Sequence, residues 1–149
     1  MTTQIGDCLI DGTEQFSVKP FPLDELGGAW KCIAKDGESQ SRFAVTSTGC
    51  WRGYIATWII VDNKLFLSGI EASDSQGNPL SILDLFYVDQ LPAFWFSGEL
   101  RSPIGMPIFG IIEPLYEKDN VWVFDRGQLV RKYVRTNKVP LGKRSFLDD

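Results

Sequence analysis

The chain has 149 residues, of which 44% are hydrophobic and 23% charged, and this length corresponds to a single domain with a core of its own. Its formal net charge is −4, which argues against a protein that binds the phosphate backbone of nucleic acids. The sequence contains no histidine, so mechanisms that use an imidazole as base, metal ligand or pH switch are excluded.

The first third of the chain is predicted to contain short strands and one helical turn. Residues 23–26 have the composition of a single helical turn, which we expect to end at Gly27 and Gly28 because glycine commonly terminates helices. The weaker strand predictions cover residues 8–10, 16–18, 29–34 and 42–45.

The clearest predicted element is a β-hairpin over residues 53–71. Apolar side chains occupy both faces of its first strand, residues 54–61, which is typical of a strand that is covered on both sides. Asp62 and Asn63 are expected to form a two-residue turn, because both residue types tolerate the positive φ that such turns require. Residues 64–70 return as the second strand.

A second hairpin is predicted over residues 121–135, with Arg126 and Gly127 at its turn. In the returning strand, Val130 and Val134 face one way and the arginine and tyrosine residues face the other. This alternation indicates one packed side and one side in water. Between the two hairpins, further strands are expected at residues 81–88, 94–101 and 108–112.

These patterns together predict one all-β domain over residues 1–149, a barrel or sandwich of about nine or ten strands. Its sheet is expected to be mixed but mainly antiparallel, and closed or nearly closed. Residues 136–149 are polar and are expected to form a flexible tail. Because the chain shows no signal sequence, apolar run of about 20 residues or lipidation motif, we expect a cytoplasmic protein that does not bind membranes.

The three cysteines, Cys8, Cys32 and Cys50, are widely spaced and contain no C-x-x-C pair. A disulfide would leave one thiol over, and a zinc site would need a carboxylate or water as fourth ligand because histidine is absent. We therefore expect no metal and no cofactor, and reduced thiols that pack as small apolar residues in a cytosolic protein.

Two segments combine aromatic side chains, a glycine and an arginine within a few residues. The first is CWRGY at residues 50–54. In the second, strand alternation places Trp95, Glu99 and Arg101 on one face, where a planar or sugar-like group could stack and form hydrogen bonds. A structural Glu–Arg pair beside a half-buried tryptophan is the alternative for this face. The candidate binding residues are Trp51, Arg52, Tyr54, Trp95, Glu99 and Arg101.

The succession WRGYIATW, DNKLFLSGI, FWFSGELR and LYEKDNVWVFDRGQLV resembles a set of uncharacterised bacterial proteins with the motifs WRGYxAxW, KLYLxxI, WFSGxLR and VYE. The resemblance covers residues 49–130, and the sequence departs from the pattern after Arg101, where it has SPIGMPIFGIIEP. The resemblance implies one recurrent small β domain, without an activity or catalytic residues. Small bacterial proteins of this kind are sometimes partners of secreted toxins.

The tripeptide GAW at residues 28–30 is similar to the G-x-W signature of lipocalins, which opens the first strand of a ligand-binding barrel. In such barrels the tryptophan closes one end against an arginine from a late strand, and Arg131 or Arg135 would supply that arginine here. This resemblance implies an alternative function, in which a barrel binds a small apolar ligand.

The leading functional prediction is a non-catalytic module that binds another protein, concretely an immunity-type protein that neutralises a basic bacterial toxin. The small-ligand barrel would instead need an enclosed apolar cavity of about 300–1,000 Å³. A third alternative is a carboxylate-based hydrolase, which would need two inward carboxylates about 5–9.5 Å apart. The candidate carboxylates for it are Glu71, Glu99, Glu113 and Glu117.

Overall fold

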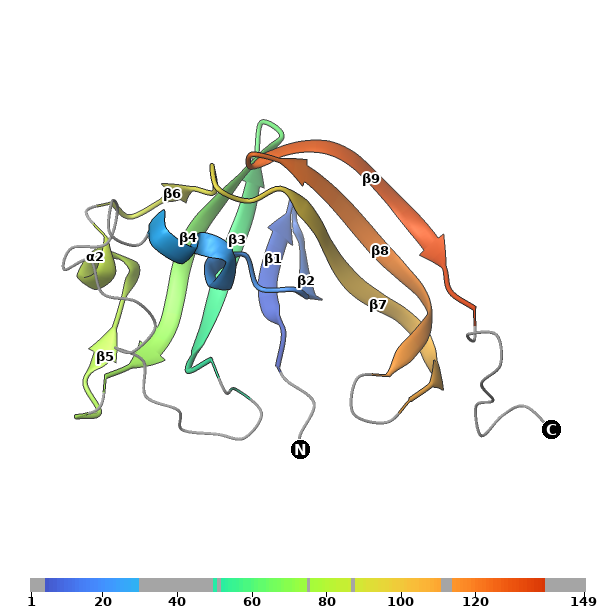
Figure 1. Ribbon diagram of the computed structural model, residues 1–149, viewed down its shortest axis with the longest axis horizontal. Coiled ribbons are helices and arrows are strands. Elements are labelled where there is room, and N and C mark those ends of the chain that lie inside the picture. Colours follow the sequence, from blue (N-terminus) through green and yellow to red (C-terminus); the bar gives the residue numbers. More distant parts are fainter. Residues whose placement is uncertain are drawn as a thin grey trace.

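The computed structural model describes residues 5–29, 50, 52–74, 76–86, 88–110 and 114–138. Its elements are β1 (Asp7–Asp11), β2 (Glu14–Val18), the 3-10 helix η1 (Pro22–Ala29), β3 (Tyr54–Val61), β4 (Lys64–Ser73), β5 (Pro79–Leu80), α2 (Ile82–Leu85), β6 (Leu91–Pro92), β7 (Gly98–Phe109), β8 (Leu115–Asp125) and β9 (Gln128–Thr136). Within these residues, nine strands form one mixed sheet in the order β2-β1-β3-β4-β9-β8-β7, with β5 and β6 also paired to β4 (Figure 1). The predicted all-β class is confirmed.

Both predicted hairpins are present, and their turns have the expected backbone geometry. Asp62 and Asn63, between β3 and β4, have φ values of 52° and 61°. Arg126 and Gly127, between β8 and β9, have φ values of 48° and 79°. A Cβ atom on Gly127 would lie 2.6 Å from the carbonyl oxygen of Ala93, so this turn has room only for glycine.

β2 and β7, the first and last strands in the order of the sheet, meet at one point. Directly after β2, Lys19 forms an antiparallel bridge with Arg101 of β7, with backbone N–O distances of 3.0 and 2.7 Å. Figure 1 shows β1 and β2 between β3 and β7, so the curved sheet consists of two halves that meet at this bridge. At the opposite ends of these halves, β4 and β9 form a single residue pair, Lys64 with Gln128, beside their turns. Because each junction is a single residue pair, the sheet is not closed; of the closed or nearly closed arrangements that the sequence predicted, the closed one is wrong.

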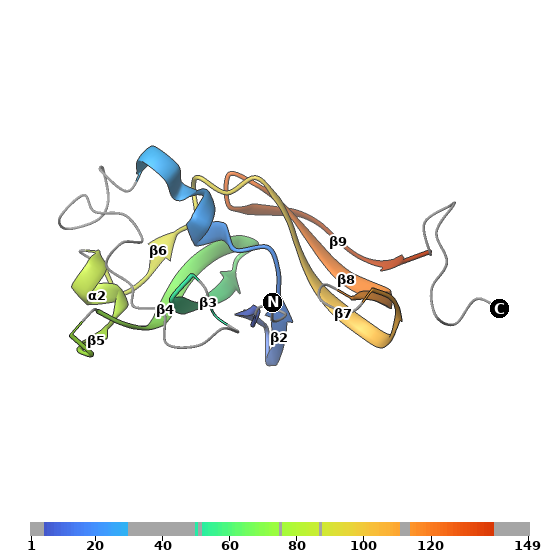
Figure 2. The ribbon, with the colours of Figure 1, turned by 60° about the horizontal axis from the view of Figure 1, so that its bottom comes forward.

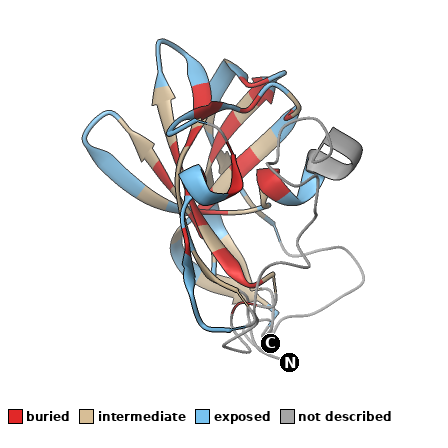
Figure 3. Ribbon diagram, turned by 90° about the vertical axis from the view of Figure 1, so that its left-hand side faces the viewer, coloured by how far each residue is buried: buried red, intermediate tan, exposed pale blue. Residues whose placement is uncertain are grey.

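The hydrophobic core lies along the inner side of this curve. On β3 the alternate residues Tyr54, Ala56 and Trp58 are buried, whereas Ile55 and Thr57 between them are half-buried. The same alternation is visible along the strands in Figure 3. One face of β3 therefore packs in the core, and its second face, which we expected to be covered as well, is covered only in part.

The predicted strand over residues 81–88 is wrong, because this segment begins with the helix α2. The Ser81 hydroxyl accepts a hydrogen bond from the Asp84 amide, and the Asp84 carboxylate accepts one from the Ser81 amide. This reciprocal capping box satisfies amides that a helix start otherwise leaves unpaired. Ile82 and Leu85 point into the core with the i, i+3 spacing of a helix.

β7 begins later and continues further than the sequence predicted. The strand expected over residues 94–101 begins only at Gly98, because a turn precedes it, closed by a 3.0 Å bond from the Phe96 amide to the Ala93 carbonyl. Of the strand expected at residues 108–112, Ile108 and Phe109 are the end of the same element, which runs past two register shifts against β8, and Gly110 lies beyond it.

The predictions for the two ends of the chain are met in part. β1 and β2 contain the strands expected at residues 8–10 and 16–18. η1 does not end at Gly27 and Gly28 but continues through both. The expected tail begins later than predicted, because Thr136 still belongs to β9. The predictions for residues 30–34, 42–45, 111–112 and 139–149 lie outside the described residues.

Candidate functional site

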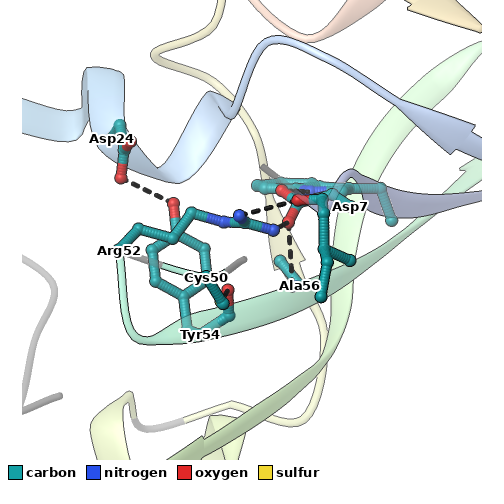
Figure 4. Close-up of polar contacts among 8 residues, drawn as sticks. Asp7, Asp24, Cys50, Arg52, Tyr54 and Ala56 are labelled. Carbon is teal, nitrogen blue, oxygen red and sulfur yellow. Dashed lines mark hydrogen bonds and ion pairs between the residues drawn. The ribbon is translucent and has the colours of Figure 1, made fainter. Parts of the chain in front are cut away.

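The densest group of polar contacts lies beneath η1, where β1 meets β3 (Figure 4). The Asp7 carboxylate is completely buried and accepts a 2.7 Å bond from Nη2 of Arg52. Its oxygens also accept bonds from the Ala56 amide and from Nε1 of Trp58, both at 3.1 Å. The Arg52 side chain is only 5% exposed, and its Nη1 donates to the Ile5 carbonyl at 2.8 Å. Asp7 and Arg52 therefore form an ion pair from which water is largely excluded.

Aromatic rings enclose the guanidinium of Arg52. Its Cζ atom lies 3.8 Å from the centre of the Phe21 ring and 5.1 Å from that of Tyr54, within the range of cation–π attraction. The Tyr54 hydroxyl donates to Oδ1 of Asp24 at 2.7 Å, which ties η1 to β3 (Figure 4). The Cys50 thiol donates to the Tyr54 carbonyl at 3.2 Å, so the residues just before β3 belong to the same group.

Burial determines the electrostatics of this group. It raises the pKa of Asp7, and the charge of Arg52 and the hydrogen bond from Trp58 offset only part of that effect. Burial also raises the pKa of Tyr54, so its hydroxyl remains a neutral donor to Asp24. Both oxygens of Asp7 and both terminal nitrogens of Arg52 are engaged in hydrogen bonds. The arrangement joins β1, β3 and η1.

Trp95 lies beside this buried group and not on a strand face. Its Nε1 donates to the Pro22 carbonyl of η1 at 2.7 Å, and its ring meets the Trp58 ring edge-on with 6.2 Å between the centroids. The prediction that Trp95 shares a strand face with Glu99 and Arg101 is therefore wrong. Trp95 helps to hold η1 over the core.

Glu99 and Arg101 lie on the outer face of β7. Oε1 of Glu99 is 3.8 Å from Nη1 of Arg101 and 3.1 Å from Nη1 of Arg135. Arg135 also reaches Asp119 at 3.5 Å, so the network extends across β7, β8 and β9. Because these side chains are partly exposed, such ion pairs contribute little to stability. The remaining predicted binding residue, Trp51, lies outside the described residues.

A groove of about 470 Å³ opens at the seam between β2 and β7. Lys19 and Arg101 contribute charged groups to its lining, and Pro103, Leu115 and Tyr116 contribute apolar surface. Pro103 is exposed to solvent and the others are half-buried, so the groove is open to water. It is not the enclosed apolar cavity that the small-ligand barrel would require.

The lipocalin-like features are not assembled in the described residues. Gly28 and Ala29 belong to η1 and not to a strand, and Trp30 lies outside the described residues. The guanidinium of Arg131 lies over the ring of Tyr133, with 4.2 Å between Cζ and the ring centre. The second candidate arginine is part of the ion-pair network on the outer face of the sheet.

Asp11, at the end of β1, makes a second set of contacts between distant strands. Its Oδ2 accepts bonds from Nε1 of Trp122 on β8 at 3.0 Å and from Nζ of Lys132 on β9 at 2.8 Å. The bond from Lys132 is the largest cause of the lowered pKa of Asp11. These contacts fasten the tip of the β1–β2 hairpin to the other half of the sheet.

We expect Asp11→Asn to destabilise the protein at neutral pH and to have little effect in acid. A carboxyl group whose pKa is lower in the folded state than its usual value of about 3.9 stabilises the fold above that pH, and this contribution is lost as the pH falls through the folded-state pKa. Urea unfolding from about pH 7 to about pH 3 should show a difference between wild type and variant that shrinks below about pH 4. Glu14→Gln, at an exposed position on β2, is the control. A difference that stays constant with pH would exclude the Asp11 charge as its cause.

Sequence reasoning missed Asp7 and Asp11, although a signal for both was present. The strand prediction covered residues 8–10, and one further residue at each end places both aspartates on the same face as Leu9. Leu9 is completely buried. A carboxylate on a core-facing strand position requires partners, because burying it alone is costly.

Comparison with known proteins identifies no relative of this chain. No family model matches it, and neither a curated protein nor a solved structure does. The resemblance to uncharacterised bacterial proteins stays a prediction from motifs. In the part of the chain that the structure describes, no helix has the length and apolar character needed to cross a membrane.

Proposed function

We propose that this protein is a non-catalytic binding module of the bacterial cytoplasm that binds a basic protein, with neutralisation of a toxin as the concrete case. The supporting observation is that α2 and the residues after it expose two apolar side chains, each next in sequence to an exposed carboxylate. Leu83 and Val88 are 52% and 39% exposed, and Asp84 and Asp89, next to them in the sequence, are also exposed. We refer to Leu83, Asp84, Val88 and Asp89 as the α2 patch.

The distribution of charge around the α2 patch favours a basic partner. Residues 62–91 contain five acidic residues and one basic residue, whereas residues 114–138 contain three acidic and six basic residues. The first segment includes β4, β5 and α2, at the left of Figure 1, and the second forms β8 and β9, at the right. A basic protein would therefore be steered toward the α2 end of the molecule.

Two further observations fit a reduced protein without catalytic groups. Cys8 and Cys50 are free thiols, as proteins of a reducing compartment usually have. Burial raises the pKa values of Asp7 and Tyr54, and both side chains are enclosed and hydrogen-bonded. Catalytic groups with such shifts lie in clefts that a substrate can enter.

The test measures binding of the purified protein to the products of the genes adjacent to its own, by isothermal titration calorimetry. We expect one basic product to bind, with an affinity that falls as the salt concentration rises. Replacing Leu83 and Val88 together by alanine should weaken this binding by about tenfold or more, because exposed apolar side chains at the centre of an interface are its usual anchors.

Ile5→Ala combined with Met106→Ala is the matched control, because these side chains are similarly exposed, at 47% and 67%, but lie outside the α2 patch. The control should bind as the wild type does. If no adjacent gene product binds, the toxin-neutralising function is refuted. If a product binds and both double variants keep full affinity, the α2 patch is not the binding surface.

A further inference from the structure

β9 leaves a long edge of the sheet without a partner strand in the described part of the chain. On one side it pairs with β8 along its length. On the other side Gln128 pairs with Lys64, and the Leu129 amide donates to the Asn63 carbonyl at 2.7 Å. From Val130 onward no described strand adjoins this side. Figures 1 and 2 show β9 as the outer strand beside β8, close to β4 only at the turns.

This edge is accessible, and it is regular from Arg131 onward. Five of the seven residues from 130 to 136 are exposed, among them Val130 at 62% and Val134 at 54%. The strand contains no proline. Its one register shift against β8 leaves a bulge at Val130 beside the turn, and from Arg131 to Thr136 the pairing with β8 is regular. Proteins commonly protect exposed edges with short strands, prolines or bulges along the edge, and a regular edge of this length is a template for another strand.

The charged side chains of β9 determine which strand could pair with it. Arg131, Lys132 and Arg135 are all basic, and β9 contains no acidic residue. Of these, Arg131 makes no ion pair with a described residue, and its guanidinium lies over the Tyr133 ring. Opposite charges directly across two strands are stabilising, whereas like charges are destabilising. An acidic strand is therefore favoured as the neighbour of β9.

A second copy of the protein is disfavoured at the same edge. Two β9 strands related by a two-fold axis at Tyr133 would place Arg131 of each copy opposite Arg135 of the other. With the axis at Lys132, the two lysines would oppose each other. Both arrangements bring like charges together, so the basic residues disfavour self-association in these two registers, whereas an acidic segment meets no such repulsion.

We propose that residues 130–136 of β9 bind an extended segment of a partner protein by strand addition, and that this segment alternates acidic with apolar residues. Backbone hydrogen bonds along the edge would supply affinity. A carboxylate of the segment would oppose Arg131, whose guanidinium makes no ion pair with a described residue, and its apolar side chains would contact Val130 and Val134. The proposal does not depend on the α2 patch, because it uses a different surface and a partner of opposite charge.

The test uses the intact protein and three fluorescein-labelled peptides of nine residues. Fluorescence anisotropy measures the affinity of each peptide, and backbone amide shifts in NMR spectra of the protein locate the binding site. In the first peptide glutamate alternates with valine, in the second lysine replaces glutamate, and in the third the acidic sequence has N-methylated amides at alternate residues. We expect only the first to bind, with shift changes concentrated at residues 130–136 and an affinity that falls with salt. Sedimentation should show a monomer in the absence of peptide.

Arg131→Glu should weaken binding of the acidic peptide by about tenfold or more. Arg126→Glu, which makes the same charge change in the β8–β9 turn outside the edge, should bind as the wild type does, and thermal melting confirms that both variants are folded.

Failure of the acidic peptide to bind, or equal binding by the Arg131 variant, overturns the proposal. Equal binding of the N-methylated peptide also overturns the proposal, since the peptide would then bind without backbone hydrogen bonds to β9. A dimer that blocks the peptide would assign the edge to a second copy and likewise overturn the acidic partner.

Discussion

Replacing Arg52 by alanine is expected to lower the free energy of unfolding by about 3–5 kcal/mol, because the substitution leaves a buried carboxylate without its counter-ion. Asp7 is completely buried and, among the described residues, would keep the hydrogen bonds from Trp58 and the Ala56 amide alone. Denaturant unfolding followed by tryptophan fluorescence measures the loss. Arg52→Lys should recover only part of the stability, since an ammonium group cannot reproduce the fork that bonds both Asp7 and the Ile5 carbonyl.

Arg131→Ala is the matched control for this experiment, because Arg131 is exposed and its guanidinium lies over the Tyr133 ring without an ion pair to any described residue. It should cost less than about 1 kcal/mol. A double variant, Asp7→Leu with Arg52→Met, should be much more stable than Arg52→Ala, since an apolar pair of similar volume can replace a buried ion pair at little cost. An Arg52→Ala loss no larger than that of the control would mean that water reaches the pair and that backbone pairing alone holds β1.

Trp58→Ala is also expected to cost about 3–5 kcal/mol, as removal of a buried aromatic side chain usually does. Trp58 is completely buried on β3, packs edge-on against Trp95 and donates its indole N–H to Asp7. Trp58→Phe keeps much of the packing and loses the donor, so its smaller loss measures the hydrogen bond. Scanning calorimetry and denaturant unfolding check both values.

Phe94→Ala is the control for Trp58→Ala, because Phe94 also contacts Trp95 but is 50% exposed. Its loss should be clearly smaller than that of Trp58→Ala, since less apolar surface is removed from the interior. Equal losses for the two variants would show that β3 is not at the centre of the core.

The hairpins could be predicted from the sequence because the information that specifies them is local. Asp62-Asn63 and Arg126-Gly127 are turn residues, and alternating segments flank both. The helix α2 was missed because it comprises only four residues, too few for helical periodicity to be distinguished from a short apolar strand. The capping box was nevertheless visible as Ser81 and Asp84. Trp95 was misplaced because strand alternation was extended back into the turn before β7, which the bond from the Phe96 amide to the Ala93 carbonyl closes.

The candidate site was harder to predict because its partners are far apart in the sequence. Arg52 and Tyr54 were found as a local motif, but their partners Asp7 and Asp24 lie 45 and 30 residues away. A single sequence contains no signal that pairs such positions. The exposed valines of β9 were missed for a related reason. Alternation predicted a packed side for that strand, but β4 diverges from β9 after one residue pair, and the composition of β9 does not encode this divergence.

The parallel pairing of β1 with β3 has a consequence for the rate of folding. The β3–β4 and β8–β9 hairpins need to close only short loops, and such hairpins form in about 1–10 μs. β1 must instead pair with β3 across a long loop, since 45 residues separate Asp7 from Arg52. Closing this loop costs conformational entropy, and the contacts of Asp7, Leu9 and Asp11 offset that cost only when they form together. We therefore expect the docking of the N-terminal strand to limit the folding rate, so that substitutions in β1 slow folding more than they accelerate unfolding.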